Sequence, residues 1–296
     1  MATLTFLGSS VAVPSIGHDN TYLCVETQAS TLLIDCAGSP LLKMQLAGIE
    51  PARLRHVIFT HRHPDHMYGF PILMLGLWLL GQSSPVRAPS QRDGVPTGWS
   101  TYPVQVVAEP ETLRTSEQLL ELFRPEEWPG LVRPQYRPID LRQESVVLDL
   151  PELLVTACAT DHLIPSIGLK LLNTKSGRSV VYSSDTAPSP NLVHLARGAN
   201  MLIHEASGAF PGHSSAAQAA QVAESAGVGA LYLIHYPAGD WAGLGPTDEM
   251  AGHGSAPAQR CRDSAPKGGI GALLTEARQV YSGPVELARD FGTLEF

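Results

Sequence analysis

Cysteine and charge are both scarce in this chain of 296 residues. The four cysteines, Cys24, Cys36, Cys158 and Cys261, are scattered and form no CxxC pair. Because the chain also opens without a signal peptide, we expect reduced thiols and a cytoplasmic location. Charged residues make up only 16% of the chain, but hydrophobic residues make up 44%, which excludes a disordered protein and allows a sizeable core.

Basic residues and long apolar runs are also in short supply. Lys and Arg number 20 against 28 Asp and Glu, a net charge of −8, which disfavours non-specific attraction to nucleic acid or to an anionic membrane. The longest apolar run, from Phe70 to Leu80, is too short to cross a bilayer, so no membrane partner is expected. We predict a buried helix there; an oligomer contact, as in a homodimer, and a wall of a substrate pocket are the alternatives.

A cluster of metal-binding side chains follows the apolar run Val57-Ile58-Phe59. It contains His61, His63, Asp65 and His66 within six residues. Neutral imidazole and carboxylate suit zinc and related ions, whereas such a cluster makes little sense as packed core. If the segment turns from a strand into a helix, one loop serves two adjacent metal ions.

Three more candidate ligands stand just past apolar strands. His162 follows the predicted strand 153–158, Asp185 follows 180–184, and His235 follows 231–234. Polar residues at such positions lie at a sheet edge, where sites are built, although each taken alone is more often structural.

A second histidine motif points to proton transfer. His213 precedes a predicted helix capped by Ser214 or Ser215, and Glu205 ends an earlier strand. A nearby carboxylate orients a histidine and raises its pKa, so the pair suits a proton donor; a helix cap is the equally weighted alternative. Asp35, Asn20 and Ser9 lie at early strand ends and are candidates for hydrogen-bonding the ligands; ordinary turn capping is the alternative for Ser9 and Asn20.

Strands recur along the chain in two blocks, each accompanied by helices. No linker divides the blocks, so we expect one α/β domain over 1–296, with two sheets flanked by helices. Segments 82–103 and 236–269 are rich in small residues and proline, and we predict that they are loop insertions.

Together these motifs resemble the metallo-β-lactamase superfamily, and specifically its ribonuclease Z-like branch. The resemblance rests on the segments Phe6–Ser9 with Pro14 and Asn20, Ile34–Gly38, Thr60–His66, Asp161–Gly168, Ser184–Thr186, His204–Ser207, Gly212–Ser215 and Leu233–Tyr236. The Thr60–His66 motif is specific for the superfamily. The segments around Glu205 and His213 are similar to the HEAT and HST motifs that mark the phosphodiesterase branch.

The resemblance implies an αβ/βα sandwich of two mixed sheets, in four layers, with a dinuclear site at one edge. It implies that one zinc ion is held by His61, His63 and His162, a second by Asp65, His66 and His235, and that Asp185 bridges them; Mn²⁺ and Fe²⁺ are alternatives to Zn²⁺. A hydroxide between the ions is the implied nucleophile, oriented by Asp65. His213, supported by Glu205, is the implied proton donor.

The chain departs from the branch where that branch binds tRNA. Only 22 residues separate His162 from Asp185, the place where tRNA-processing members carry a long basic arm, and Gly17-His18-Asp19-Asn20 lacks the usual Arg. The leading hypothesis is therefore a hydrolase of a small phosphodiester. A tRNA 3′-processing endoribonuclease, a hydrolase of another ester such as an aryl sulfate or lactone, and a non-enzymatic metal-binding module are the alternatives.

Overall fold

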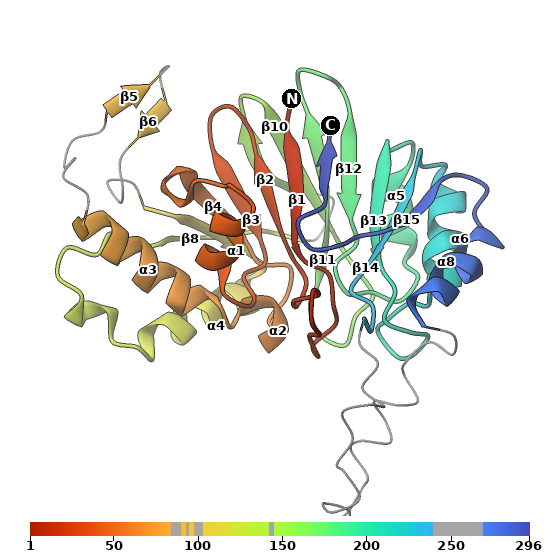
Figure 1. Ribbon diagram of the computed structural model, residues 1–296, viewed down its shortest axis with the longest axis horizontal. Coiled ribbons are helices and arrows are strands. Elements are labelled where there is room, and N and C mark those ends of the chain that lie inside the picture. The colour runs from red at the N-terminus through yellow and green to blue at the C-terminus, as the bar shows by residue number, and fades with distance from the viewer. Residues whose placement is uncertain (84–89, 93–94, 98–102, 142–144, 239–268) are drawn as a thin grey trace, which may run out of the picture.

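Two seven-stranded mixed sheets face each other across a shared core. The computed structural model describes residues 1–83, 90–92, 95–97, 103–141, 145–238 and 269–296 (Figure 1). The first sheet has the strand order β16 (Thr293–Glu295), β1 (Thr3–Gly8), β2 (Tyr22–Glu26), β3 (Thr31–Ile34), β4 (Leu54–Ile58), β7 (Gln105–Ala108) and β8 (Gln135–Pro138). The second has the order β15 (Val285–Leu287), β14 (Leu231–Ile234), β13 (Met201–Glu205), β12 (Ser179–Tyr182), β11 (Ile167–Asn173), β10 (Leu153–Ala159) and β9 (Ser145–Leu150).

Each sheet is antiparallel at one side and parallel at the other. Strands β16, β1, β2 and β3 pair antiparallel, and β3, β4, β7 and β8 pair parallel. In the second sheet, β9 to β12 pair antiparallel and β12 to β15 pair parallel. The parallel strands are covered on both faces, which is why β12 and β13 are buried along their whole length.

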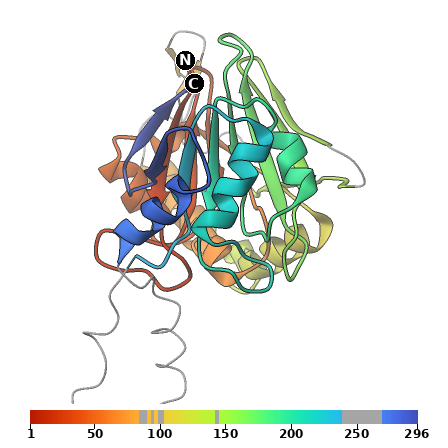
Figure 2. The ribbon, with the colours of Figure 1, turned by 90° about the vertical axis from the view of Figure 1, so that its right-hand side faces the viewer.

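Helices cover the outer face of each sheet. The first sheet packs against α1 (Pro40–Leu46), α2 (Pro64–Met67), α3 (Phe70–Ser83) and α4 (Pro110–Glu121). The second packs against α5 (Pro190–Ala196), α6 (Ala216–Ala226) and α8 (Ile270–Arg278), as Figure 2 shows. Short 3₁₀ turns occur at η1 (Pro51–Arg53) and η2 (Pro125–Glu127).

These layers confirm the predicted αβ/βα sandwich. Buried side chains of both sheets, such as Leu32, Ile58, Leu169 and Ile203, form one apolar cluster between them. Because β16 at the end of the chain pairs with β1 at its start, we propose that the chain forms one domain. Among the described residues, no helix combines the length and the apolar character that a bilayer span requires.

The helix predicted at Phe70 to Leu80 is α3, and a separate short helix, α2, precedes it. The backbone N–H of Cys36 donates to the carbonyl of His66 (2.7 Å), and the N–H of Gly69 donates to the carbonyl of Cys36 (2.9 Å). A Cβ on Gly69 would lie 2.8 Å from the Ala37 carbonyl oxygen, so only glycine permits this close approach. The loop after β3 therefore separates the two helices and orients α2, which carries two of the candidate ligands.

The predicted insertions lie largely outside the described residues. Within 82–103, the structure describes the end of α3 and a short antiparallel pair, β5 (Ser90–Arg92) with β6 (Val95–Thr97), whereas the sequence predicted a loop throughout. The sequence Asp93-Gly94 between these strands is a hairpin signal that the surrounding small residues obscured. Of 236–269, only 236–238 and 269 are described.

Candidate metal centre

The seven candidate ligands come together at one edge of the two sheets, near α2 in Figure 1. His61 and His63 lie in the loop after β4, Asp65 and His66 in α2, and His162, Asp185 and His235 after β10, β12 and β14. Their nitrogen and oxygen atoms form two groups, and within each group the atoms lie within 4.8 Å of one another. The structure therefore brings together every metal ligand that the sequence suggested.

The first group contains His61, His63, His162 and Asp185. His63 Nδ1 is 3.0 Å from His61 Nε2 and 3.1 Å from His162 Nε2, and His61 Nε2 is 3.7 Å from Asp185 Oδ2. In a tetrahedral zinc site with bonds of about 2.1 Å, neighbouring ligand atoms lie roughly 3.4 Å apart. The measured separations suit one shared ion.

The second group contains Asp65, His66 and His235. His66 Nε2 is 3.7 Å from Asp65 Oδ2 and 3.5 Å from Asp185 Oδ1, and His235 Nε2 is 3.4 Å from Asp185 Oδ2. Asp185 thus contacts ligand atoms of both groups. The Asp185 side chain is only 3% exposed, so bulk water hardly solvates its carboxylate.

Hydrogen bonds fix how the histidine rings face this centre. Thr60 and Thr21 donate their hydroxyl protons to Asp35 and to the Ser10 carbonyl, so they accept from Nδ1–H of His61 and His235, both at 3.1 Å. The other two rings are held in the same way: His66 Nδ1 is 2.8 Å from Asp35 Oδ2, and His162 Nδ1 is 2.8 Å from the Gly212 carbonyl. A ring that carries its proton on Nδ1 presents the Nε2 lone pair, so all four rings face the centre as ligands.

The burial and the pKa values of the candidate ligands show whether this site suits metal ions. His66 Nε2 and Asp185 Oδ1 are buried, and no described group hydrogen-bonds to either. Burial lowers the pKa of His61, His63 and His162, which keeps the neutral, ligating form. Burial opposes the charge of Asp185, but His235, His66 and His61 hold its pKa well below its usual range. The donor set fits divalent ions that prefer imidazole and carboxylate.

Three strands end at this edge in an unusual backbone conformation. Asp35, Ser184 and His235 have φ values of 62°, 53° and 50°, in the left-handed region that non-glycine residues rarely adopt. Each such residue costs on the order of 1 kcal/mol or more, and such residues cluster at functional sites. Here the conformation ends a strand and turns its side chain or its neighbour toward the centre.

His213 lies beside the centre and is held by Glu205. The His213 ring is 4.9 Å from the His162 ring and 6.4 Å from the His235 ring, measured between centroids. Its Nδ1 is 2.9 Å from Glu205 Oε1. Burial disfavours the charged ring, but Glu205 outweighs it and raises the pKa of His213. The pair predicted from the sequence is therefore in direct contact.

Glu205 is fully buried and surrounded by donors. Its two oxygens also accept from the backbone N–H groups of Thr186, Ser207 and Ser214 and from the Ser207 hydroxyl. A neutral glutamine would turn an NH₂ group toward one of these donors. The carboxylate is thus needed both to hold the 207–214 segment and to orient His213.

Of Asp35, Asn20 and Ser9, which were predicted to hydrogen-bond the ligands, only Asp35 forms a hydrogen bond with one among the described residues. Asp35 contacts a candidate ligand, as expected. Ser9 instead bonds to His18 and Asp290, and Asn20 to the Val11 carbonyl and the Tyr68 hydroxyl. Thr21 and the Gly212 carbonyl, which hold His235 and His162, were not predicted from the sequence. Thr21 stands next to Asn20, but neither its type nor its spacing distinguishes it from a turn residue.

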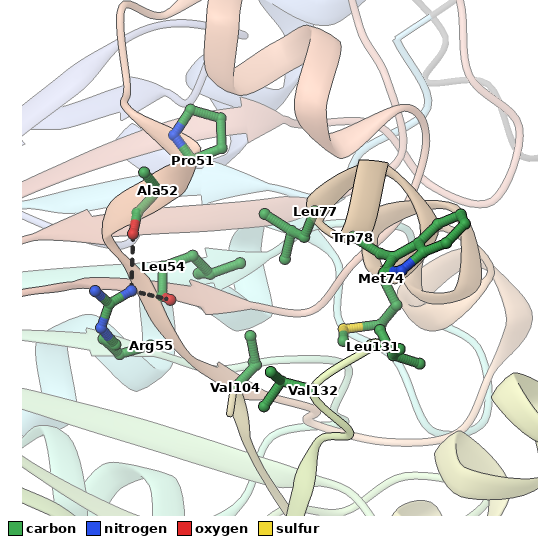
Figure 3. Close-up of a pocket in the computed structure, with 10 residues that line it drawn as sticks. All are labelled: Pro51, Ala52, Leu54, Arg55, Met74, Leu77, Trp78, Val104, Leu131 and Val132. Carbon is green, nitrogen blue, oxygen red and sulfur yellow. Dashed lines mark hydrogen bonds between the residues drawn. The ribbon is translucent and has the colours of Figure 1, made fainter. Parts of the chain in front are cut away.

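A separate cavity lies on the α3 side of the first sheet (Figure 3). It is not a candidate for the active site. Its volume is about 30 Å³, room for a few water molecules at most. Arg55 carries the only charge among its described lining residues and donates to the carbonyls of Ala52 and Leu54. The cavity is too small for a substrate and offers no carboxylate or imidazole.

Comparison with known proteins places the chain in a family. A model of the β-lactamase superfamily domain matches residues 30–236. The chain belongs to this superfamily. The matched region contains all seven candidate ligands and ends one residue after His235.

Curated relatives of this superfamily member carry a more specific name. A ribonuclease Z from Methanothermobacter thermautotrophicus is 28% identical over 267 residues, covering 79% of this chain and 86% of the relative. A ribonuclease Z from Mycobacterium sp. (strain KMS) is 29% identical over 260 residues, covering 80% and 84%. The resemblance to the ribonuclease Z-like branch is thus confirmed, and the chain is a hydrolase of the metallo-β-lactamase superfamily.

Solved structures of this superfamily share the fold over nearly the whole chain. YhfI from Bacillus subtilis, a metallo-β-lactamase fold protein, is 20% identical with a TM-score of 0.70, covering 100% of this chain and 99% of that one. The short form of human tRNase Z is 20% identical with a TM-score of 0.68, covering 99% and 98%. A diphosphatase of the PhnP family is 19% identical with a TM-score of 0.66, covering 100% and 98%.

Proposed function

We propose that this superfamily member is a dinuclear metal-dependent phosphodiesterase that acts on a small substrate. The observation that carries the proposal is the His213–Glu205 pair beside two adjoining ligand groups. Hydrolysis of a phosphodiester with a basic leaving oxygen needs both an activated water and a proton for that oxygen. A histidine with a raised pKa at this position supplies one.

The seven candidate ligands form two groups, each suited to one metal ion. His61, His63 and His162 would hold one ion, Asp65, His66 and His235 would hold the other, and Asp185 would contribute to both. When bound, two such ions lower the pKa of water and neutralise the negative charge of the phosphoryl oxygens. Zn²⁺ is the ion we favour, because the set combines five imidazoles with two carboxylates; Mn²⁺ and Fe²⁺ are the alternatives.

Asp65 orients the attacking water, and His213 supplies the proton to the leaving oxygen. Asp65, 15% exposed and at the first turn of α2, accepts a hydrogen bond from the attacking water and so orients it. His213, 14% exposed, reaches solvent and substrate through the ring atoms that Glu205 does not hold. It donates its proton to the leaving oxygen, while Glu205 stabilises the cationic ring beforehand.

A tRNA 3′-processing endoribonuclease is the second candidate, supported by the relatives named ribonuclease Z. Two observations weigh against it. Where the arm would stand, β11 and β12 form a simple hairpin joined at 174–178. The net charge of −8 also opposes tRNA, because binding depends on Lys and Arg neutralising phosphates. We favour a cytoplasmic location, since Cys24, Cys36 and Cys158 are buried and form no disulfide among the described residues; Cys261 lies outside the described residues.

One substrate panel separates these functions. Zinc-supplemented protein is assayed on alkyl and nitrophenyl phosphodiesters, phosphomonoesters, aryl sulfates, lactones and precursor tRNA at equal metal content. We expect turnover of the phosphodiesters and weak, salt-sensitive binding of tRNA. Cleavage of precursor tRNA well above the rate on small diesters would establish the second candidate, and turnover of none would favour a non-enzymatic module.

The role of His213 is tested by the leaving group. His213→Ala should cost about 10²- to 10⁴-fold on a diester with an alkoxide leaving group, but far less on a nitrophenolate, which leaves without a proton. Zinc content should not change, because His213 is outside the ligand set. His194→Ala, an exposed histidine on α5, is the matched control. Equal, small losses on both substrates, with reduced thermal stability, would make His213 a structural residue.

A further inference from the structure

An exposed aromatic ring lies directly against the proposed proton donor. Phe210 is 44% exposed, and its ring centroid is 4.8 Å from that of His213, with 49° between the planes. Leu163, which follows the candidate ligand His162, is 66% exposed. Single exposed apolar residues are common on protein surfaces, so exposure alone indicates nothing. What sets Phe210 apart is that it touches the group that must meet the substrate's leaving oxygen.

Backbone hydrogen bonds hold the segment that carries this ring. Phe210 N–H donates to the Gly208 carbonyl, His213 N–H donates to the Phe210 carbonyl, and Gly208 N–H donates to the Ser214 carbonyl, each at 3.0 Å. The Phe210 ring lies so close to the backbone that a Cβ on Gly208, where φ is 136°, would be 2.6 Å from its Cε1. The 208–214 loop thus holds the Phe210 backbone beside His213, and the ring lies over Gly208.

The same loop positions the neighbouring leucine. A Cβ on Gly212, where φ is 79°, would lie 3.1 Å from Leu163 Cγ and 3.0 Å from His162 Nδ1. Leu163 therefore lies against Gly212, the residue before His213, whereas the Phe210 ring lies against His213 itself. Two exposed apolar side chains from separate segments thus lie near this histidine.

We propose that Phe210 and Leu163 form the subsite for the leaving group, and that this group is a flat aromatic one, such as a nucleobase-bearing nucleoside. The inference rests on the proposed function. If His213 protonates the leaving oxygen, the group attached to that oxygen lies next to the His213 ring. Phe210, in contact with that ring, is then within reach of it. Stacking on a phenyl ring stabilises a planar π-system more than an alkyl chain, and it does not depend on which base is bound.

Ligand binding tests the subsite without requiring turnover. The zinc-loaded protein is titrated by calorimetry with adenosine 5′-monophosphate and with ethyl phosphate, which share the phosphate but not the base. We expect the nucleotide to bind at least about tenfold more tightly. Phe210→Ala should remove about tenfold, or 1.4 kcal/mol, from nucleotide binding only. Phe210→Trp should retain the preference, and Phe123→Ala, 57% exposed at the end of α4, should not change it.

Turnover then separates this inference from the function on which it rests. On diesters with nucleoside or ethyl leaving groups, Phe210→Ala should lower kcat/KM only for the nucleoside. Zinc content and thermal unfolding verify the fold, and Phe210→Leu replaces the alanine variant if it does not fold. Equal binding of the two phosphates by the parent, or equal losses in the variant, would overturn the subsite. A parent that cleaves no phosphodiester would instead overturn the proposed function, while the binding comparison still decides the subsite.

Discussion

Asp35→Asn should weaken the metal centre although Asp35 is not a proposed ligand. The Asp35 carboxylate is fully buried and faces only donors: Oδ1 accepts from the Thr60 N–H at 2.8 Å, and Oδ2 is 2.8 Å from His66 Nδ1. The Thr60 hydroxyl donates to the same carboxylate. Asparagine has nearly the same volume but only one acceptor oxygen. In either orientation its NH₂ group meets a donor, at Thr60 or at His66.

The loss of metal affinity depends on which of the two donors loses its acceptor. If the NH₂ group faces His66, the ring loses the partner that keeps its proton on Nδ1 and its Nε2 lone pair directed at the centre. Loss of such a partner typically lowers metal affinity by about 10- to 100-fold. That corresponds to about 1.4–2.8 kcal/mol. The ion held by Asp65, His66 and His235 should be affected most, because Asp35 touches the ring of His66.

Metal retention against a chelator measures the effect. Parent and variant are loaded with zinc, titrated with a competing chelator and analysed for metal bound per chain. The variant should release one ion at about 10- to 100-fold lower chelator concentration and keep the other longer. Asp149→Asn, an exposed aspartate on β9, controls for the change of charge. If Asp35→Asn retains both ions as well as the parent does, the orienting role assigned to this hydrogen bond is wrong.

Three further predictions concern metal content, stability and pH. Asp185→Ala should lose metal as well as activity, because Asp185 contacts both ligand groups; full occupancy by elemental analysis would refute the site. Asp290→Ala should lower the free energy of unfolding by roughly 3 kcal/mol in denaturant titrations, because this carboxylate accepts from Ser9, Asp19 N–H and Lys43 (2.8, 3.0 and 2.6 Å) and its loss leaves a largely buried ammonium with a weaker partner; a loss below about 1 kcal/mol would contradict this. Burial lowers the pKa of His56 from 6.5 to about 4, so the unfolded chain binds more protons between these values and stability falls as the pH drops through that window. His56→Gln should remove about 2 kcal/mol of the loss between pH 7 and 5, and parallel stability curves for the two proteins would refute it.

The sequence alone determined most of the ligand set. His61, His63, Asp65 and His66 lie within six residues, and a short segment places its side chains together whatever surrounds it. His162, Asp185 and His235 could also be predicted, because each follows an apolar strand and strand ends meet at a sheet edge. The two blocks of strands with their helices were enough to indicate two covered sheets.

Only the tertiary structure decided how those ligands are oriented. His235 is held by Thr21, 214 residues away, and His162 by the carbonyl of Gly212, 50 residues away. A backbone carbonyl is present at every residue and therefore has no sequence signature, and a threonine in a turn resembles any other. The break between α2 and α3 likewise depends on the Cys36–Ala37 backbone lying against Gly69. Residue types record which groups are available for chemistry, but the pairing of distant groups is determined by how the sheets and loops pack.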